Sequence, residues 1–210
     1  MNQKIRIACV GDSITYGYGT NNIENESYPA RLQELLGDNF IVNNYGVNAM
    51  TVLSNTETPY TQTVQYLQSL ESNADIVILM LGTNDAKLGN WAKNETNFIL
   101  DYEKLINKYK GMESNPYIFI ATSPTAWRDY GILDDNTIIP EIVDEKVVVI
   151  QREMAKKFEC GLIDIHNYTN DMKDFFPDTI HPDIEGYQII ATFVYEGIKD
   201  YCENLLANKE

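Results

Sequence analysis

Basic residues are scarce in this sequence. Its 210 residues contain 16 Lys and Arg against 31 Asp and Glu, which gives a formal net charge of -15. A charge of this size and sign repels nucleic-acid phosphates and anionic lipid headgroups at long range. We therefore expect neither a nucleic acid nor a membrane as a partner, whereas the sequence leaves a homo-oligomer open.

Long apolar runs and a disulfide framework are also lacking. No stretch approaches the roughly 20 apolar residues of a membrane span, and residues 1–6 lead directly into a strand-like segment instead of a signal sequence. The three cysteines, Cys9, Cys160 and Cys202, stand far apart, and three thiols cannot all pair. We expect a cytoplasmic protein whose thiols are reduced and lie in or near the core.

Glycine and proline number only 12 and 7, while hydrophobic residues make up 44% of the chain. This composition excludes a disordered or collagen-like chain and is typical of a globular protein. No internal repeat and no linker of low complexity divides the sequence, and its length is ordinary for one domain. We expect a single domain over residues 1–210.

Short apolar runs that are typical of buried strands alternate with segments of helical periodicity. The expected strands are 5–10, 40–44, 75–81, 117–122 and 161–166, and the expected helices are 28–36, 61–70, 95–110, 140–158 and 184–205. This alternation predicts an α/β fold of three layers, with a flavodoxin-like five-stranded parallel sheet in the order 2-1-3-4-5. Ligands of such folds bind beyond the carboxyl ends of the strands.

The segments that follow strands 2, 1 and 3 lie side by side in this topology. Gly46, Ser13 and Asn84 are therefore expected to be neighbours, although they are far apart in the sequence. Ser13 stands where the first strand must bend towards a helix. Its hydroxyl becomes a nucleophile if a base removes the proton and an acid orients that base.

Two histidines are available as the base. His166 follows Asp164 by two residues, which places both on one face of the expected fifth strand. His181 follows Asp178 by three residues, and Pro182 biases this segment towards a loop. The residues alone leave both pairs open.

Two other kinds of site stay open as well. Small and hydroxyl-bearing residues after the first strand could cradle the phosphate of FMN in a binding module, namely Ser13, Thr15, Gly17, Gly19 and Thr20. Asp12, Asp85 and Asp178 could instead form an oxygen-rich Mg²⁺ site for phosphoryl transfer.

Four motifs stand in order along the chain: Gly11-Asp12-Ser13, Gly46 in the segment 44–48, Gly82-Thr83-Asn84-Asp85, and Asp178-x-x-His181. Together they resemble the motifs of the GDSL, or SGNH, hydrolases over nearly the whole chain. The resemblance implies the SGNH hydrolase fold and a serine esterase that acts on carboxylic esters through a covalent acyl-serine intermediate.

The same resemblance implies a role for each matching residue. Ser13 is the nucleophile, His181 the base and Asp178 the carboxylate that orients it. The oxyanion hole uses the backbone N–H groups of Ser13 and Gly46 and the side-chain amide of Asn84. We expect no cofactor and no metal. The FMN module, by contrast, leaves the last two motifs without a role.

The sequence is most similar to small bacterial enzymes that remove acetyl groups from sugars, whereas lysophospholipases and thioesterases of the family share the same motifs. We expect an O-acetyl ester of a carbohydrate as the substrate, with the lysophospholipase or thioesterase type as the alternative. Segments 86–94 and 123–139 follow strands and are expected to recognise the substrate. The candidate substrate-binding residues are Asp12, Trp91, Trp127 and Arg128.

Overall fold

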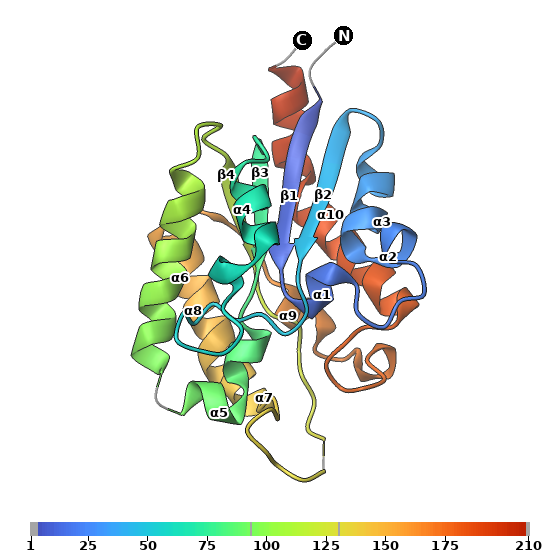
Figure 1. Ribbon diagram of the computed structural model, residues 1–210. Helices are drawn as coiled ribbons and strands as arrows, with labels where there is room; N and C mark the ends of the chain where they lie inside the picture. The colour runs from blue at the N-terminus through green and yellow to red at the C-terminus, as the bar shows by residue number, and fades with distance from the viewer. Residues whose placement is uncertain (1–3, 93, 130, 209–210) are drawn as a thin grey trace.

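A parallel sheet forms the centre of the computed structural model, which describes residues 4–92, 94–129 and 131–208. The strands are β1 (Ile5–Gly11), β2 (Phe40–Gly46), β3 (Ile76–Met80), β4 (Tyr117–Ala121) and β5 (Gly161–Ile163). Their order is β2-β1-β3-β4-β5, and all neighbours are parallel. This topology confirms the prediction, and the carboxyl ends of the strands meet at one edge of the sheet (Figure 1).

Helices fill most of the connections. They are α1 (Ser13–Tyr16), α2 (Ile23–Glu26), α3 (Tyr28–Leu36), α4 (Val64–Leu70), α5 (Leu88–Trp91), α6 (Glu95–Lys110), α7 (Pro140–Ile142), α8 (Val148–Lys157), α9 (Ile165–Thr169) and α10 (Ile184–Ala207). Single 3₁₀ turns occupy Tyr60–Gln62, Thr83–Ala86 and Lys173–Phe175, and a π-helical turn, Val143–Val147, joins α7 to α8. No described helix is both long enough and apolar enough to cross a bilayer.

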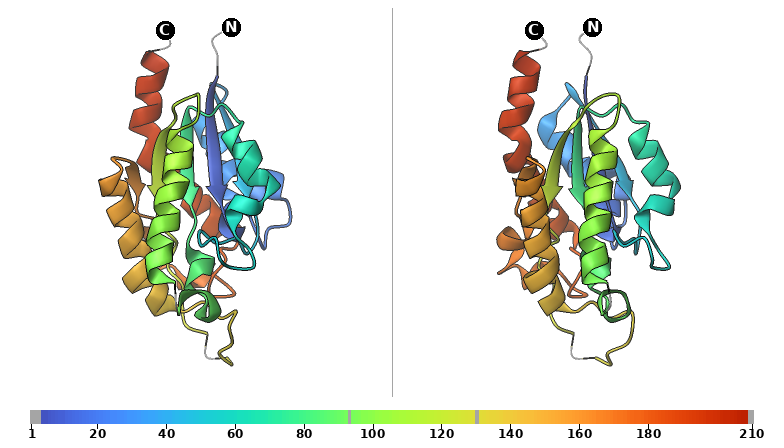
Figure 2. Two further views of the ribbon diagram at one scale, coloured as in Figure 1. Left: turned by 60° about the vertical axis from the view of Figure 1, so that its left-hand side comes forward. Right: turned by 90° about the vertical axis from the view of Figure 1, so that its left-hand side faces the viewer.

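The helices form two layers, one on each face of the sheet. Helices α4, α6 and α8 cover one face, and α3 and α10 cover the other (Figures 1 and 2). Successive side chains of β1 enter the two layers in turn, because Ala8 and Val10 pack with the first set of helices while Ile7 and Cys9 pack with the second. A strand segment buried on both faces is apolar at successive positions, which is why β3 and residues 7–10 of β1 are continuous hydrophobic runs.

The last strand is shorter than its sequence suggests. It ends at Ile163, because Asp164 caps the start of α9 by accepting a hydrogen bond from the N–H of Asn167. His166 therefore lies in a helix. The expectation that His166 and Asp164 share one face of a strand is wrong.

The site end of the molecule is opposite to the chain ends. Strand β1 begins, and α10 ends, at the edge away from the carboxyl ends of the strands (Figure 1). The segment 122–139 extends from β4 at the site end, where it passes beside α5 and α7. The fold thus leaves one edge of the sheet, with its connecting loops, for a functional site.

Candidate active site

The first loop places Ser13 at the start of α1. Asp12 caps this helix, since its Oδ1 accepts a hydrogen bond of 3.0 Å from the N–H of Ile14. Gly11 is required by close packing, because a Cβ there would lie 2.0 Å from Oγ1 of Thr15. Each residue of the Gly-Asp-Ser motif thus has a local reason, and the last of them opens into a pocket.

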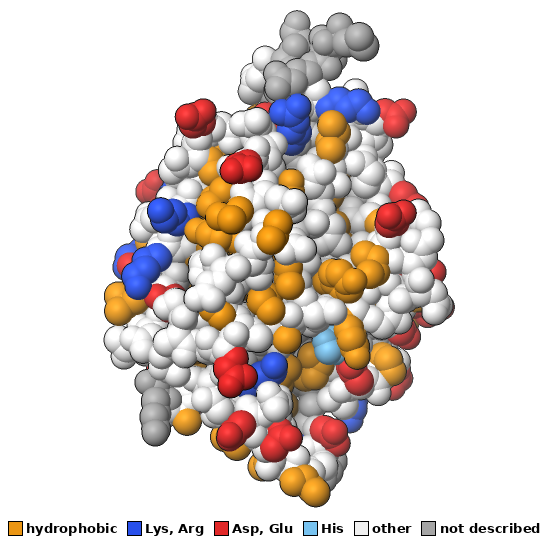
Figure 3. All heavy atoms as spheres, viewed as in Figure 1, with side chains coloured by type: hydrophobic (Ala, Val, Ile, Leu, Met, Phe, Trp, Pro, Cys, Tyr) orange, Lys and Arg blue, Asp and Glu red, His pale blue; other side chains and the backbone are white. Residues whose placement is uncertain are grey.

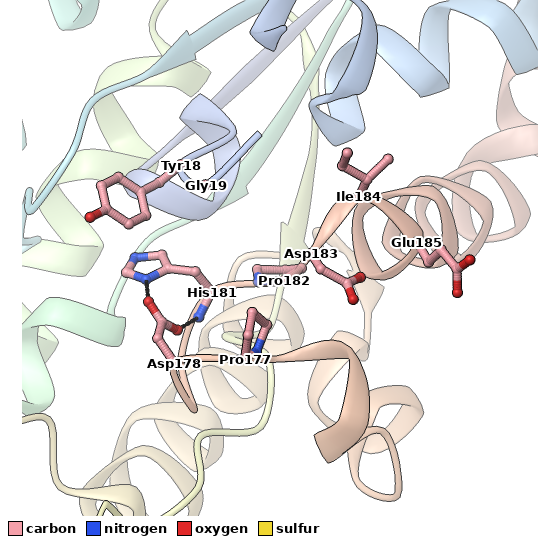
Figure 4. Close-up of a pocket in the computed structure, with 9 residues that line it drawn as sticks. All are labelled: Tyr18, Gly19, Pro177, Asp178, His181, Pro182, Asp183, Ile184 and Glu185. Carbon is pink, nitrogen blue, oxygen red and sulfur yellow. Dashed lines mark hydrogen bonds and ion pairs between the residues drawn. The ribbon is translucent and has the colours of Figure 1, made fainter. Parts of the chain in front are cut away.

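Ser13, His181 and Asp178 form a continuous hydrogen-bonded chain. Oγ of Ser13 lies 2.8 Å from Nε2 of His181, and Nδ1 of His181 lies 2.6 Å from Oδ2 of Asp178. Figure 4 shows the second of these contacts. The other carboxylate oxygen of Asp178 accepts the backbone N–H groups of His181 and Ile180 at 2.6 and 3.0 Å.

These bonds determine the charge of the carboxylate. Burial on its own would raise the pKa of Asp178, but the hydrogen bonds from His181 and Ile180 outweigh it and lower that pKa below its ordinary value. Asp178 is therefore ionised at neutral pH. An ionised partner holds the Nδ1 proton of His181 and leaves Nε2 free to accept a proton from the serine hydroxyl.

Tyr18 is a member of this site that sequence reasoning missed. Its ring lies against that of His181, with centroids 4.5 Å apart and planes inclined by 44° (Figure 4). The backbone carbonyl of Tyr18 accepts a hydrogen bond from Tyr187 of α10 at 2.8 Å. Its neighbours Gly17 and Gly19 have φ angles of 99° and 88°, which fold the chain back towards the histidine. These two glycines are the signal that could have identified it.

Asn84 reaches the same pocket from the segment after β3. One N–H of its amide donates to the carbonyl of Met50 at 3.2 Å, and the second amide hydrogen is available for a ligand. The adjacent Asp85 holds the facing loop, because its carboxylate accepts the N–H groups of Val52 and Leu53 at 3.0 and 2.8 Å. Burial raises the pKa of Asp85 to about 7, although these two hydrogen bonds lower it in part.

Contrary to the prediction, Gly46 does not line the pocket. Its N–H donates to Oδ1 of Asn44 at 2.9 Å, and a Cβ at this position would lie 2.1 Å from the backbone nitrogen of Tyr16. The pocket is lined instead by Ala49, whose φ of 67° lies in the left-handed region. We therefore correct the sequence-based assignment: Gly46 allows β2 and α1 to approach each other, and Ala49 lines the pocket in its place.

The reaction pocket, as we call this cavity, has a volume of about 270 Å³. Its lining includes Ser13, Asn84, Lys87, Ile138, Ile180 and His181. Two isoleucines face mainly polar neighbours, so the pocket suits a small acyl group attached to a polar alcohol.

The four predicted substrate-binding residues lie in different places. Asp12 is 1% exposed and lies beneath Ser13 as a helix cap, and Trp91 is 7% exposed and packs on Phe98 in the core. The prediction that Asp12 and Trp91 bind the substrate is therefore wrong about their position, because neither residue lines the pocket. The side chain of Arg128 forms an ion pair with Glu141. Trp127 is half-buried against Phe176 and lines a second cavity beside the reaction pocket.

The alternatives drawn from the sequence fit less well. Asp164 forms a two-point ion pair with Arg152 at 2.9 and 3.1 Å, and Nε2 of His166 lies 3.6 Å from Asp144, so the rival pair does not form. Thr15 is fully buried, which removes it from a phosphate cradle. Within the described ranges, no three His, Cys, Asp or Glu side chains converge as metal ligands would.

Comparisons with known proteins agree with this geometry. Residues 9–189 match the model of the GDSL-like lipase/acylhydrolase family. The chain belongs to this family. This GDSL-family chain is 32% identical to an acetylxylan esterase of Xylanibacter ruminicola, and the match covers 93% of the chain. The chain spans only 43% of the length of that relative.

Solved structures confirm the fold of this GDSL-family chain. A carbohydrate acetylesterase family member from Sinorhizobium meliloti matches with a TM-score of 0.74 and 21% identity, covering 97% of this chain and 99% of that one. The native aryl esterase of M. smegmatis matches with the same TM-score and 18% identity, covering 93% and 99%. The four sequence motifs that resemble those of the family thus occur in a chain that also has the family's fold.

Proposed function

We propose that this chain is a serine esterase that removes O-acetyl groups from carbohydrates. The observation that carries the proposal is the chain of hydrogen bonds from Ser13 through His181 to Asp178, with distances of 2.8 and 2.6 Å. The similarity to an acetylxylan esterase supports the choice of substrate class.

The reaction follows from the positions of these groups. Oγ of Ser13 attacks the acetyl carbonyl carbon while Nε2 of His181 takes its proton, and Asp178 stabilises the imidazolium. The bond to the sugar oxygen then breaks, and His181 returns the proton to this leaving alcohol. Water attacks the acetyl-serine in the same way, with His181 as base, and releases acetate and free Ser13.

Three donors would stabilise the oxyanion that forms at the carbonyl. We assign this role to the backbone N–H of Ser13, the second amide hydrogen of Asn84 and the backbone N–H of Ala49, which replaces Gly46 in the proposal. Each donor is fixed by the fold before the substrate binds, so no reorganisation opposes the developing charge.

The lining of the reaction pocket favours acetyl over long acyl groups. A long chain gains about 0.8 kcal/mol for each buried CH₂, but only in a continuous apolar trough. Beside Ser13 the pocket presents Asn48, Asn84 and Lys87 instead, together with a volume of about 270 Å³. A lysophospholipase or thioesterase would need a different wall here.

The test uses 4-nitrophenyl esters whose acyl chains run from two carbons to about twelve. We expect kcat/KM to be highest for the acetate and to fall with chain length, and mass spectrometry of a quenched reaction to find one acetyl group on Ser13. Ser13→Ala should lose both turnover and label, with Ser123→Ala, a buried serine outside the site, as the matched control. A kcat/KM that climbs with chain length would identify a lipase-like enzyme, and full activity in Ser13→Ala would overturn the mechanism.

A further inference from the structure

A second cavity lies next to the reaction pocket, and we call it the distal cavity. It has a volume of about 220 Å³, and its lining includes Trp127, Asp129, Asp134 and Thr137. Asn136, Ile138 and Ile180 line both cavities. A molecule held at Ser13 can therefore extend across these three side chains into the distal cavity.

The walls of the distal cavity are held in place by the backbone of the long segment after β4. The N–H of Trp127 donates to the carbonyl of Thr179 at 3.0 Å, beside the catalytic loop. Further along, the carbonyls of Thr137 and Asp135 accept the N–H groups of Leu88 and Gly89, each at 3.0 Å. The two segments that the sequence nominated for substrate recognition are thus joined to each other, and the cavity is formed before a ligand arrives.

The chemistry of the lining points to one class of ligand. Asp129 and Asp134 offer carboxylate oxygens as acceptors, the side-chain amide of Asn136 offers both donors and an acceptor, and Trp127 offers an apolar surface. The hydroxyl of Thr137 donates its hydrogen to Oδ1 of Asp134 and holds that carboxylate in place. Sugar rings carry hydroxyl donors on their edges and C–H groups on their faces, which matches this combination. An alkyl chain could form none of these polar contacts.

The negative charge of the protein further restricts the kind of sugar that the distal cavity would bind. Acidic side chains gather at the site end on the face shown in Figure 3, and the whole chain carries a net charge of -15. A uronic acid in the distal cavity would face Asp129 and Asp134 and be repelled. A neutral sugar residue has no such cost.

A third cavity, of about 400 Å³, flanks the site on the other side of His181. It shares only Tyr18 and His181 with the reaction pocket, and these two rings lie against each other (Figure 4). Pro177, Pro182 and Ile184 give it a more apolar surface, although three carboxylates line it as well, those of Asp178, Asp183 and Glu185. The distal cavity shares three side chains with the reaction pocket instead of two and is less apolar, so it is the better continuation for a hydroxylated ligand.

We propose that the distal cavity is a subsite for a neutral sugar residue linked to the acetylated one, so that the protein acts on acetylated oligosaccharides in preference to acetylated monosaccharides. This inference rests on the proposed esterase function. It adds a determinant of substrate length, carried by Trp127, Asp129 and Asp134, in a cavity adjacent to the pocket in which the ester bond breaks.

The experiment compares kcat/KM for three probes: 4-nitrophenyl acetate, mono-O-acetylated methyl β-xyloside and mono-O-acetylated xylotriose. The wild-type protein should prefer the trisaccharide to the monosaccharide by about tenfold or more, which corresponds to about 1.4 kcal/mol. Trp127→Ala should lose most of this preference, because kcat/KM falls much more on the trisaccharide than on 4-nitrophenyl acetate, which carries no second sugar to fill the distal cavity. The matched control is Glu185→Gln, which changes the flanking cavity and should keep the preference.

A second variant guards against a folding defect in Trp127→Ala, since that ring packs on Phe176. Asp129→Asn retains the Oδ1 that accepts the N–H of Gly131 and removes only the charge. Wild type should hydrolyse an acetylated xylo-oligosaccharide bearing a uronic acid more slowly than its neutral counterpart, and Asp129→Asn should narrow that gap.

Each outcome has one meaning. Failure to hydrolyse any of the three esters, 4-nitrophenyl acetate included, would refute the proposed function itself. Hydrolysis with equal kcat/KM for monosaccharide and trisaccharide, or a preference that survives in Trp127→Ala, would refute the subsite and leave the esterase intact. A preference lost in Glu185→Gln but kept in Trp127→Ala would place the sugar in the flanking cavity and overturn the proposal.

Discussion

The buried carboxylate beneath the nucleophile should make the stability of this protein fall as pH rises. Asp12 is 1% exposed, and burial raises its pKa from 3.8 to about 6, against smaller opposing effects of the Ile14 N–H and of His181. The Thr83 side chain also lowers this pKa, but burial outweighs all of these effects. The folded protein therefore binds a proton at this site more tightly than the unfolded chain does.

The size and direction of the effect follow from this difference. The stabilisation from a protonated Asp12 is fully present below pH 3.8 and is lost as pH rises through about 6. A shift of about two pKa units corresponds to about 3 kcal/mol. The free energy of unfolding of the wild type should thus fall by about 2 kcal/mol between pH 4 and pH 8 through Asp12, since part of the full difference is already lost at pH 4.

Asp12→Asn isolates this contribution, because an asparagine keeps the Oδ1 that caps α1 and cannot titrate. Urea unfolding of both proteins, followed by circular dichroism, gives the difference in unfolding free energy at each pH. Contributions of groups that do not interact with Asp12 cancel in this difference, whereas Asp85, whose pKa the charge of Asp12 helps to raise, retains a smaller contribution. We expect this difference to move in favour of the variant by about 2 kcal/mol between pH 4 and pH 8.

Asp101→Asn is the control of opposite sign. Burial would raise the pKa of Asp101, but hydrogen bonds from Lys104 and from the N–H of Ser54 lower it. The wild type therefore gains stability over this variant as pH rises towards the unfolded pKa of 3.8, and above that pKa the difference stays constant. A difference between wild type and Asp12→Asn that stays constant across the whole range would refute the assignment of a raised pKa to Asp12.

The remaining predictions concern the site. His181→Ala should lower kcat on 4-nitrophenyl acetate by about 10⁴-fold or more, whereas His166→Ala should stay largely active; equal losses would refute the choice of base. Asn84→Ala should lower kcat by about 10²- to 10³-fold with little change in KM, and a change in KM alone would contradict an oxyanion role. Thermal denaturation should show Gly46→Ala destabilised by about 2 kcal/mol or more, because its Cβ meets the backbone of α1. Ala49→Gly should be stabilised by about 1 kcal/mol, because glycine adopts the φ of 67° at lower cost, and a loss of stability there would refute that reasoning.

Most of the fold could be predicted, because burial of apolar residues determines both the strands and the long helices. Helices α3 and α6 begin and end as expected, since Pro29 stands in the first turn of α3 and glycines follow both helices. The segment 140–158 forms α7, a π-helical turn and α8 in spite of its β-branched run. Val147, Val148 and Ile150 of that run are buried against the sheet, and tertiary packing overrides their preference for strands.

The site was predictable only where topology and motif agreed. Ser13 and Asn84 follow adjacent strands, so the strand order alone brings them together. The choice between the two histidines needed the family resemblance, because the capping role of Asp164 is a local detail that ends β5 early. Ala49 gave no signal at all, since an alanine in a left-handed conformation looks like any other alanine in the sequence.

The separation between the chain ends and the site has a practical consequence for work with polymers. The last turns of α10 and the first residues of β1 lie at the edge of the sheet away from Ser13 (Figure 2). A bead, a surface or a carbohydrate-binding module joined at that edge would leave the catalytic face directed outwards. A long, branched polysaccharide could then approach the anchored protein without meeting its support.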